Sequence, residues 1–305
     1  MDGAPVFLDS TERTNFIEEG NHPMKTLNLK VLTLTLSLLA PALSAFAHDH
    51  NPAALTQVIE NVKRARAEGK QPVVMFDLDD TLINTRERTL RIIQDFVKQQ
   101  QLSSEEAQKL ANLQVNDIRF LMSDTLKDQG IQNPALAKAL GDAFLSKFFT
   151  NEFCANDQQN PGAALYAREV VRAGGKVVYL TGRDAPRMHD GTLENLRKQG
   201  FPVSSPEALL MMKPDKSTDD LQFKKDTFAQ VAAMGEMEGV FENEPANINA
   251  MADAFPAATA IFLDTIHSPT DIVPEARVSF VSDFFHGAAD GSDEAPVQED
   301  AAAAN

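Results

Sequence analysis

The stretch Pro72 to Leu82, PVVMFDLDDTL, is the most informative part of this 305-residue sequence. Val73 to Phe76 has the length and the β-branched content of a buried strand. Asp77 and Asp79 follow this strand at once, so their carboxylates would lie at the carboxyl edge of a parallel sheet, where ligands bind. Two carboxylates this close repel each other unless a cation such as Mg²⁺ neutralises them. The stretch therefore predicts a Mg²⁺ site in which one carboxylate attacks an electrophile and the other moves protons. A turn or helix N-cap after the strand is the alternative.

The residues that follow form two blocks with different periodicity. Residues 85–153 carry apolar side chains at helical spacing and no strand pattern, which predicts a helical insert over the strand ends. From about Asn160 helices alternate with strand candidates, which lie at 176–180, 208–212, 239–241 and 260–263. This alternation predicts an α/β fold with a mainly parallel sheet and helices on both faces.

Three polar features accompany these later elements. Thr181 directly follows the strand candidate 176–180, Lys224 and Lys225 lie in a helical pattern, and the acid and amide cluster ENEPAN occupies 242–247. The threonine and the lysines are weak signals when taken singly. Their order and spacing after DLDDT give them weight.

DLDDT at 77–81, Thr181, the FKK sequence and the 242–247 cluster together resemble the haloacid dehalogenase (HAD) superfamily of phosphotransferases, over essentially all of Pro72 to Asp264. The resemblance implies a Rossmann-like, three-layer parallel sheet built from residues 48–84 and 154–286, with a helical cap at 85–153. Dehalogenating members lack an acid at the position of Asp79, because a halide leaves without a proton. An acid here implies a phosphatase that acts on a phosphate ester or anhydride.

Transferred residue by residue, the resemblance implies that Asp77 is the nucleophile that forms an aspartyl-phosphate. Asp79 would be the general acid that protonates the leaving oxygen and later activates water. Thr181 and a lysine would bind the phosphoryl oxygens and neutralise their charge. Lys224 fits the Phe-Lys context of the family better than Lys225, whose alternative role is a solvated helix face.

The expected metal site is where the sequence departs from the family, whose last motif usually carries paired aspartates instead of ENEPAN. The resemblance implies that Mg²⁺ is held by the Asp77 carboxylate, the backbone carbonyl of Asp79 and one residue of this cluster. Glu242 and Asn243 are equal candidates, and Asn247 could also bind directly or through water. An amide ligand carries no charge, so metal affinity would be lower. A plain strand-to-helix turn is the alternative.

For three other charged residues near the motifs we expect roles outside the chemical step or leave several roles open. Arg183 either contacts the substrate, approaches a carboxylate such as Asp184, or forms an ordinary salt bridge. Asp80 is expected to be a turn residue. Arg88, at the start of the cap, is expected to be solvated rather than to contact the substrate.

The composition limits the partners. A net charge of -16 argues against a nucleic-acid polymer or an anionic membrane surface as the main partner. The partner that the resemblance implies is a small-molecule phosphate ester. The single cysteine, Cys154, excludes an intramolecular disulfide. Nothing in the sequence indicates an oligomeric state.

The two ends of the chain lie outside the expected fold. Residues 1–47 form a leader that contains a signal peptide at 24–47, with a basic start, an apolar stretch at 31–43 and an A-x-A site before His48. Cleavage near Ala47/His48 would export the protein to a periplasm or the medium without a stable membrane anchor; an uncleaved anchor is the alternative. Residues 287–305 are acidic with little to bury, which predicts a disordered tail.

The expected function is therefore an exported, Mg²⁺-dependent phosphatase that hydrolyses small phosphate monoesters. One alternative keeps the chemistry but uses nucleotides or nucleic-acid ends as substrates. Another is a non-catalytic exported binding protein that retains the fold.

Overall fold

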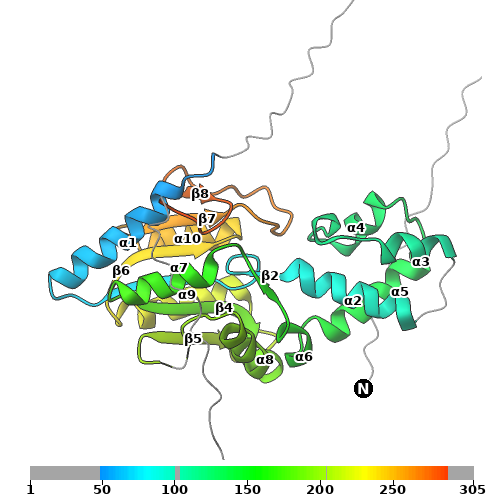
Figure 1. Cartoon of the computed structure of the whole chain (residues 1–305), viewed down its shortest axis with the longest axis horizontal. Helices are drawn as coiled ribbons and strands as arrows, with labels where there is room; N and C mark the ends of the chain where they lie inside the picture. Colours follow the sequence, from blue (N-terminus) through cyan, green and yellow to red (C-terminus); the bar gives the residue numbers. More distant parts are fainter. Residues whose placement is uncertain (1–48, 100–103, 204, 288–305) are drawn as a thin grey trace, which may run out of the picture. The chain divides into compact units, whose positions relative to one another are not determined.

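The computed structural model describes residues 49–99, 104–203 and 205–287, so the predicted signal peptide and nearly all of the predicted acidic tail lie outside the described residues. Its centre is a parallel six-stranded sheet (Figure 1). In spatial order the strands are β5 (Ala208–Lys213), β4 (Lys176–Asp184), β1 (Pro72–Phe76), β6 (Glu236–Glu242), β7 (Thr259–Leu263) and β8 (Ser279–Val281). The predicted Rossmann-like α/β fold is confirmed.

Helices cover both faces of the sheet because the strand side chains alternate in direction. Val74 and Phe76 of β1 pack in one apolar cluster, which includes residues of α1 (Pro52–Ala67), α7 (Ala163–Arg172) and α8 (Ala185–Lys198). Val73 and Met75 belong to a second cluster, with residues of α9 (Asp220–Ala232) and α10 (Pro245–Ala254). The continuous apolar run of β1 is thus explained by burial on both sides.

β1 lies at the point of the sheet where the chain changes direction from one side to the other. The chain goes from β1 to β4 on one side, and it later enters β6 on the other side. At such a reversal the loops leave a crevice beyond the carboxyl ends of the strands. Asp77 is the first residue after β1, so it lies at this crevice.

A helical segment joins β1 to β4 and lies to one side of the sheet in Figure 1. It contains α2 (Thr85–Gln99), α3 (Ser104–Ala111), the 3₁₀ turn η1 (Val115–Asp117), α4 (Met122–Asp128) and α5 (Pro134–Lys147). These elements share an apolar core of their own, and the short α6 (Asn151–Cys154) instead contacts α8. An antiparallel pair, β2 (Ile83–Asn84) and β3 (Gln158–Gln159), connects the entry and exit of the segment. We call residues 85–153 the cap; the exact boundaries of cap and core stay a prediction.

Several elements differ from the sequence-based expectation. Apolar residues at helical spacing predict a helix over 118–126, but the helix there, α4, begins at Met122, after the 3₁₀ turn. β4 continues four residues beyond Leu180, and β8 was not expected, because its three residues give too short a pattern. None of the described helices combines the length and apolar composition needed to span a membrane.

Candidate active site

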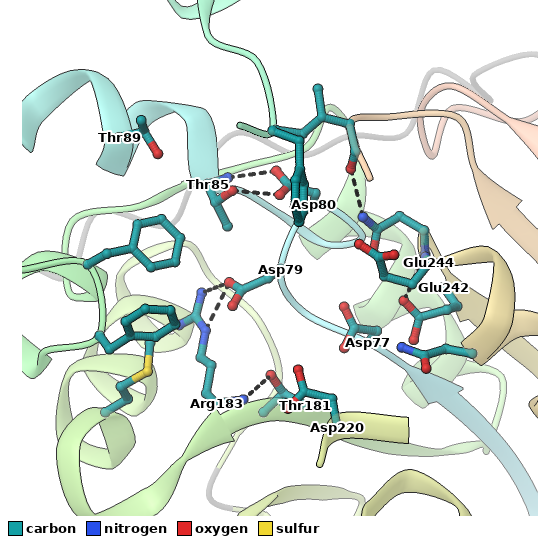
Figure 2. A pocket seen from close by; sticks show the side chains of 18 of the residues that line it. Asp77, Asp79, Asp80, Thr85, Thr89, Thr181, Arg183, Asp220, Glu242 and Glu244 are labelled. Carbon is teal, nitrogen blue, oxygen red and sulfur yellow. Dashed lines mark hydrogen bonds and ion pairs between the residues drawn. The ribbon is translucent and has the colours of Figure 1, made fainter. Parts of the chain in front are cut away.

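Asp77 and Asp79 lie on the loop that leaves β1 (Figure 2). The backbone NH of Asp77 donates to the carbonyl of Phe241 on β6 at 3.0 Å, which continues the sheet pairing to the predicted nucleophile. Asp80 has the positive φ of 55°, and its carboxylate accepts hydrogen bonds from the backbone NH of Thr85 at 3.0 Å and its hydroxyl at 2.6 Å. Asp80 is therefore the expected turn residue, and it fixes the loop to the start of α2.

Lys224 reaches Asp77 from α9. Its ammonium nitrogen lies 2.7 Å from Asp77 Oδ1 and 2.5 Å from Glu242 Oε2, and the residue is only 2% exposed. Burial alone would lower the pKa of Lys224, but the two carboxylates outweigh this and raise it. Lys225 is exposed. The structure thus brings Lys224, and not Lys225, to the predicted nucleophile.

One ammonium faces two carboxylates here, so the negative charge is only partly compensated. Burial and the neighbouring Glu242 carboxylate raise the pKa of Asp77 well above its usual value, although Lys224 acts in the opposite direction. A bound cation next to these carboxylates would favour their ionised forms.

The two metal candidates at the end of β6 have different surroundings. Glu242 is fully buried, and its Oε1 accepts the backbone NH groups of Asn243 and Glu244, each at 3.0 Å. The side chain of Asn243 is engaged at both ends: Oδ1 accepts from the Thr81 hydroxyl at 3.0 Å, and Nδ2 donates to the Ile266 carbonyl at 2.8 Å. Both oxygens of Glu242 are engaged as well, by the two backbone NH groups and by Lys224, so it is the negative charge of Glu242 that favours it over the uncharged Asn243 as a metal ligand.

The donor set around Asp77 suits a hard cation. It offers the Asp77 and Glu242 carboxylates, with Asn247 also lining the cavity. Among the described residues no group of three or more His, Cys, Asp or Glu side chains is arranged to hold an ion. Mg²⁺ is commonly bound through one or two carboxylates while it keeps several waters, so these residues fit Mg²⁺.

Thr181 and Arg183 lie at the carboxyl end of β4, where the pairing with β5 is interrupted. Thr181 pairs with Met212 and Asp184 with Lys213, so two residues on β4 bulge out between them. Thr181 is buried beside the cavity, and its hydroxyl accepts from the backbone NH of Arg183 at 3.2 Å. The bulge therefore presents a hydroxyl and a guanidinium to the site.

Arg183 contacts Asp79 rather than Asp184, which instead pairs with Arg187. Its Nε lies 3.0 Å and its Nη2 2.5 Å from Asp79 Oδ1, and Arg88 Nη2 lies 3.3 Å from the same oxygen. Burial alone would raise the pKa of Asp79, but the two arginines outweigh it and lower that pKa. The expectation that Arg88 is solvated was wrong: the residue is 2% exposed, because it is paired inside the protein.

Asp157 is a site residue that the sequence analysis missed. It has no exposed surface, and it accepts hydrogen bonds from both Arg88 and Arg183. It follows α6 on the return from the cap, far in sequence from the motifs, and a lone aspartate before two glutamines gave no signal.

A cavity of about 440 Å³ opens between these polar groups and the cap. Asp77, Asp79 and Thr181 line it from the strand ends (Figure 2), and Lys224 lines it from α9. Its other side is apolar and includes Phe120, Leu121, Met122, Phe144, Phe148, Phe149 and Met188. The cavity therefore has one end suited to an anion and one suited to an apolar group.

Two family models match the chain. The model described as HAD superfamily, subfamily IIIB (acid phosphatase), matches residues 138–240, and the model described as haloacid dehalogenase-like hydrolase matches residues 74–147. Together they cover residues 74–240, more than half of the chain, including Asp77, Thr181 and Lys224. Both models describe the haloacid dehalogenase superfamily, and the chain belongs to this superfamily of hydrolases.

Solved structures of this fold are similar at low sequence identity. A class C acid phosphatase from Bacillus anthracis with tungstate bound is 16% identical, with a TM-score of 0.37, and the match covers 64% of this chain and 64% of that one. CbbY from Rhodobacter sphaeroides in complex with phosphate is 15% identical, with 70% and 95% covered and a TM-score of 0.40. A Clostridium difficile protein is 13% identical, with 70% and 94% covered and a TM-score of 0.46. No curated protein sequence matches the chain.

Proposed function

We propose that the protein is a Mg²⁺-dependent phosphatase that hydrolyses small phosphate monoesters through an aspartyl-phosphate on Asp77. The observation that carries this proposal is the position of Asp77: it ends the central strand, contacts Lys224 at 2.7 Å and lines the cavity together with Asp79. The nucleophile, a positive charge for the phosphoryl oxygens and a proton carrier therefore share one cavity.

In the first step a carboxylate oxygen of Asp77 attacks phosphorus, and the bond from phosphorus to the ester oxygen breaks. A proton on Asp79 passes to the leaving oxygen, which departs as an alcohol. Because Arg183 and Arg88 lower the pKa of Asp79, this protonated form becomes more populated as the pH falls. Lys224 and Thr181 stabilise the charge on the transferred phosphoryl group, since both line the cavity beside Asp77.

In the second step water attacks the phosphorus of the aspartyl-phosphate. Asp79, now ionised, takes the proton of this water, and the bond between phosphorus and the Asp77 oxygen breaks. Inorganic phosphate is released, Asp77 is again a carboxylate, and Asp79 is protonated for the next cycle.

Mg²⁺ would be held by Asp77, Glu242 and the backbone carbonyl of Asp79, with Asn247 as a further oxygen donor. When bound it would neutralise charge on the phosphoryl oxygens. Phosphatases of this superfamily generally use Mg²⁺, and the partly compensated Asp77–Glu242 pair supports the same assignment here.

The cap side of the cavity favours a second candidate, a nucleotide phosphatase. Phe144 and Phe148 lie with ring centroids 4.5 Å apart, and Phe148 and Phe149 5.0 Å apart. This aromatic wall suits the face of a nucleobase or another flat ring. The net charge of -16 continues to disfavour a nucleic-acid polymer.

The test is phosphate release by the purified protein from a panel of sugar, polyol, aryl and nucleoside phosphates, with Mg²⁺ and with chelator. Asp77→Asn is the inactive variant, and Asp264→Asn, at the exposed end of β7, is the matched control. Release that needs Mg²⁺ and is lost only in Asp77→Asn is expected. If no ester is hydrolysed, a non-catalytic binding role replaces this proposal.

We also propose that the protein is exported after cleavage before His48. The sequence pattern at 24–47 supports this proposal. Expression of the full chain in a bacterial host, followed by N-terminal sequencing, should yield a protein that begins at His48. A start before His48 would indicate an uncleaved anchor instead.

A further inference from the structure

We propose that Asp157 and Arg88 are positioning residues that orient the carboxylate of Asp79 toward the leaving group. This inference rests on the proposed function, in which Asp79 gives and takes the proton. It adds to that function two residues outside the sequence motifs.

The first observation is that Asp79 is held by one oxygen. Arg183 donates to Oδ1 from Nε at 3.0 Å and from Nη2 at 2.5 Å, and Arg88 Nη2 donates to it at 3.3 Å. Among the described residues, every hydrogen bond to this carboxylate ends on Oδ1. Figure 2 shows the dashed lines from Arg183 meeting a single oxygen of Asp79, while a third of the side chain remains exposed. Oδ2 is thus the oxygen available to a substrate in the cavity.

The second observation is that Asp157 binds both arginines from behind. Its Oδ1 accepts from Arg88 Nε at 2.9 Å, and its Oδ2 accepts from Arg183 Nη2 at 3.0 Å and from Arg88 Nη2. Two guanidinium groups this close repel each other, and burial removes the solvent that would screen them. Asp157 supplies the charge that keeps both in place, so each arginine bridges the two aspartates.

Two side chains at the C-terminal end of α8 bind the backbone of Asp157. Its backbone carbonyl accepts from Asn195 Nδ2 at 2.7 Å and from Gln199 Nε2 at 3.0 Å. Arg183 Nη1 also donates to Thr192 on the same helix, at 3.0 Å. The two arginines are therefore linked to α8 in the core, and not only to Asp79 and Asp157.

Arg88 extends the arrangement into the cap. It lies on α2, its Nη1 donates to the carbonyl of Phe148 at 3.2 Å, and its guanidinium carbon lies 4.4 Å from the centroid of the Phe148 ring. Arg88 therefore contacts both the aromatic wall of the cavity and Asp79. Correct placement of the cap and correct orientation of the proton carrier depend on the same side chain.

The chemistry makes this orientation measurable. As the bond from phosphorus to an alkoxide breaks, the proton on Asp79 must lie in line with the leaving oxygen. 4-Nitrophenolate is a stable anion that leaves without this proton. A misplaced Asp79 therefore slows release of an alkoxide far more than release of 4-nitrophenolate, whereas general damage to the fold slows both equally.

The experiment compares kcat/KM for 4-nitrophenyl phosphate and 4-nitrobenzyl phosphate, two esters of similar shape, in wild type, Asp157→Asn and Arg88→Lys. The ratio of the two values cancels the amount of folded protein in each preparation. Arg91→Lys, on the same helix, is the control. Should Asp157→Asn give no folded protein, Arg88→Lys, which keeps the positive charge, supports the same comparison.

We expect kcat/KM for 4-nitrophenyl phosphate, divided by kcat/KM for 4-nitrobenzyl phosphate, to rise by about tenfold or more in both Asp157→Asn and Arg88→Lys. In Arg91→Lys this ratio should stay at the wild-type value. An unchanged ratio in the folded variants, with both rates lowered together, would overturn the positioning role and leave the proposed function intact. Hydrolysis of neither ester by the wild-type protein would overturn the proposed function, and this inference with it.

Discussion

Lys224 Nζ lies 2.7 Å from Asp77 Oδ1, and this buried contact joins α9 to the end of the central strand. The same ammonium contacts Glu242, so it lies between the predicted nucleophile and the favoured metal ligand. In this position Lys224 opposes the rise in the pKa of Asp77 that burial and Glu242 cause, and it can also neutralise an incoming phosphoryl group.

Replacing Lys224 with Met tests this contact. Lys224→Met should lower kcat/KM for phosphate esters about a hundredfold, because it removes the positive charge beside the phosphoryl group. It should also lower the free energy of unfolding in chelator, since two buried carboxylates lose their shared partner. Lys225→Met is the matched control, because Lys225 is exposed on the same helix, and it should keep near wild-type activity. Equal losses in both variants would exclude a specific role for Lys224.

Metal dependence distinguishes the two candidates at the end of β6. Glu242→Gln should raise the Mg²⁺ concentration needed for half-maximal activity by about tenfold or more, because it removes a charged ligand. Asn243→Ala should leave this concentration nearly unchanged, since the Asn243 amide is bonded to Thr81 and Ile266. Calorimetric titration of Mg²⁺ into each variant measures the affinity directly. A greater loss in Asn243→Ala would reverse the assignment.

The aromatic wall should determine preference for ring-bearing substrates. Phe144→Leu should lower kcat/KM for adenosine 5′-monophosphate relative to glycerol phosphate by about fivefold or more, because stacking on the ring is lost. Leu145→Ala, at a 64% exposed position on the same helix, is the control. If kcat/KM for adenosine 5′-monophosphate relative to glycerol phosphate is the same in Phe144→Leu and in wild type, the aromatic wall does not contact the organic part of the substrate.

Stability should depend on pH through Asp80. Burial, assisted by the charge of Asp79 and opposed by the hydrogen bonds from Thr85, raises the pKa of Asp80 to about 7. Because this pKa is raised, Asp80 keeps its proton in the folded protein at pH values where it has already lost it in the unfolded chain, above about pH 4. Its contribution to the free energy of unfolding is therefore lost as the pH rises from about 4 toward 7. Asn tolerates the positive φ of this position, so Asp80→Asn is a conservative variant.

The measurement is denaturant unfolding in chelator at about pH 5 and about pH 7. Between these values the free energy of unfolding of wild type should fall by roughly 2 kcal/mol more than that of Asp80→Asn. Parallel changes in the two proteins would show that Asp80 does not titrate in this range.

The strand and motif pattern predicted much of the fold and of the candidate site. The run before Asp77 is apolar throughout because β1 is buried on both faces, which a sequence pattern reveals directly. Thr181 and Glu242 directly follow predicted strands, and parallel strands bring such positions to one edge of the sheet. Lys224 lies on α9 and was chosen from its Phe-Lys context. Their roles in catalysis and metal binding stay predictions.

The sequence did not reveal the partners of Asp79. Arg88 and Asp157 are 69 residues apart and meet only because the chain leaves and re-enters the core at the β2–β3 pair. A charged residue that is buried with a partner looks like a solvated one in the sequence, so Arg88 was misassigned. The aromatic wall was missed for a related reason: its phenylalanines fit an ordinary amphipathic helix pattern.

The most direct test of the central claim is a burst experiment with the Asp79→Asn variant and 4-nitrophenyl phosphate. This ester needs no proton to leave, whereas hydrolysis of the aspartyl-phosphate needs Asp79 as a base. The account predicts a rapid release of 4-nitrophenol in an amount stoichiometric with the protein, followed by slow turnover, and no release from the Asp77→Asn, Asp79→Asn double variant. A burst that persists without the Asp77 carboxylate would contradict the assignment of Asp77 as the nucleophile.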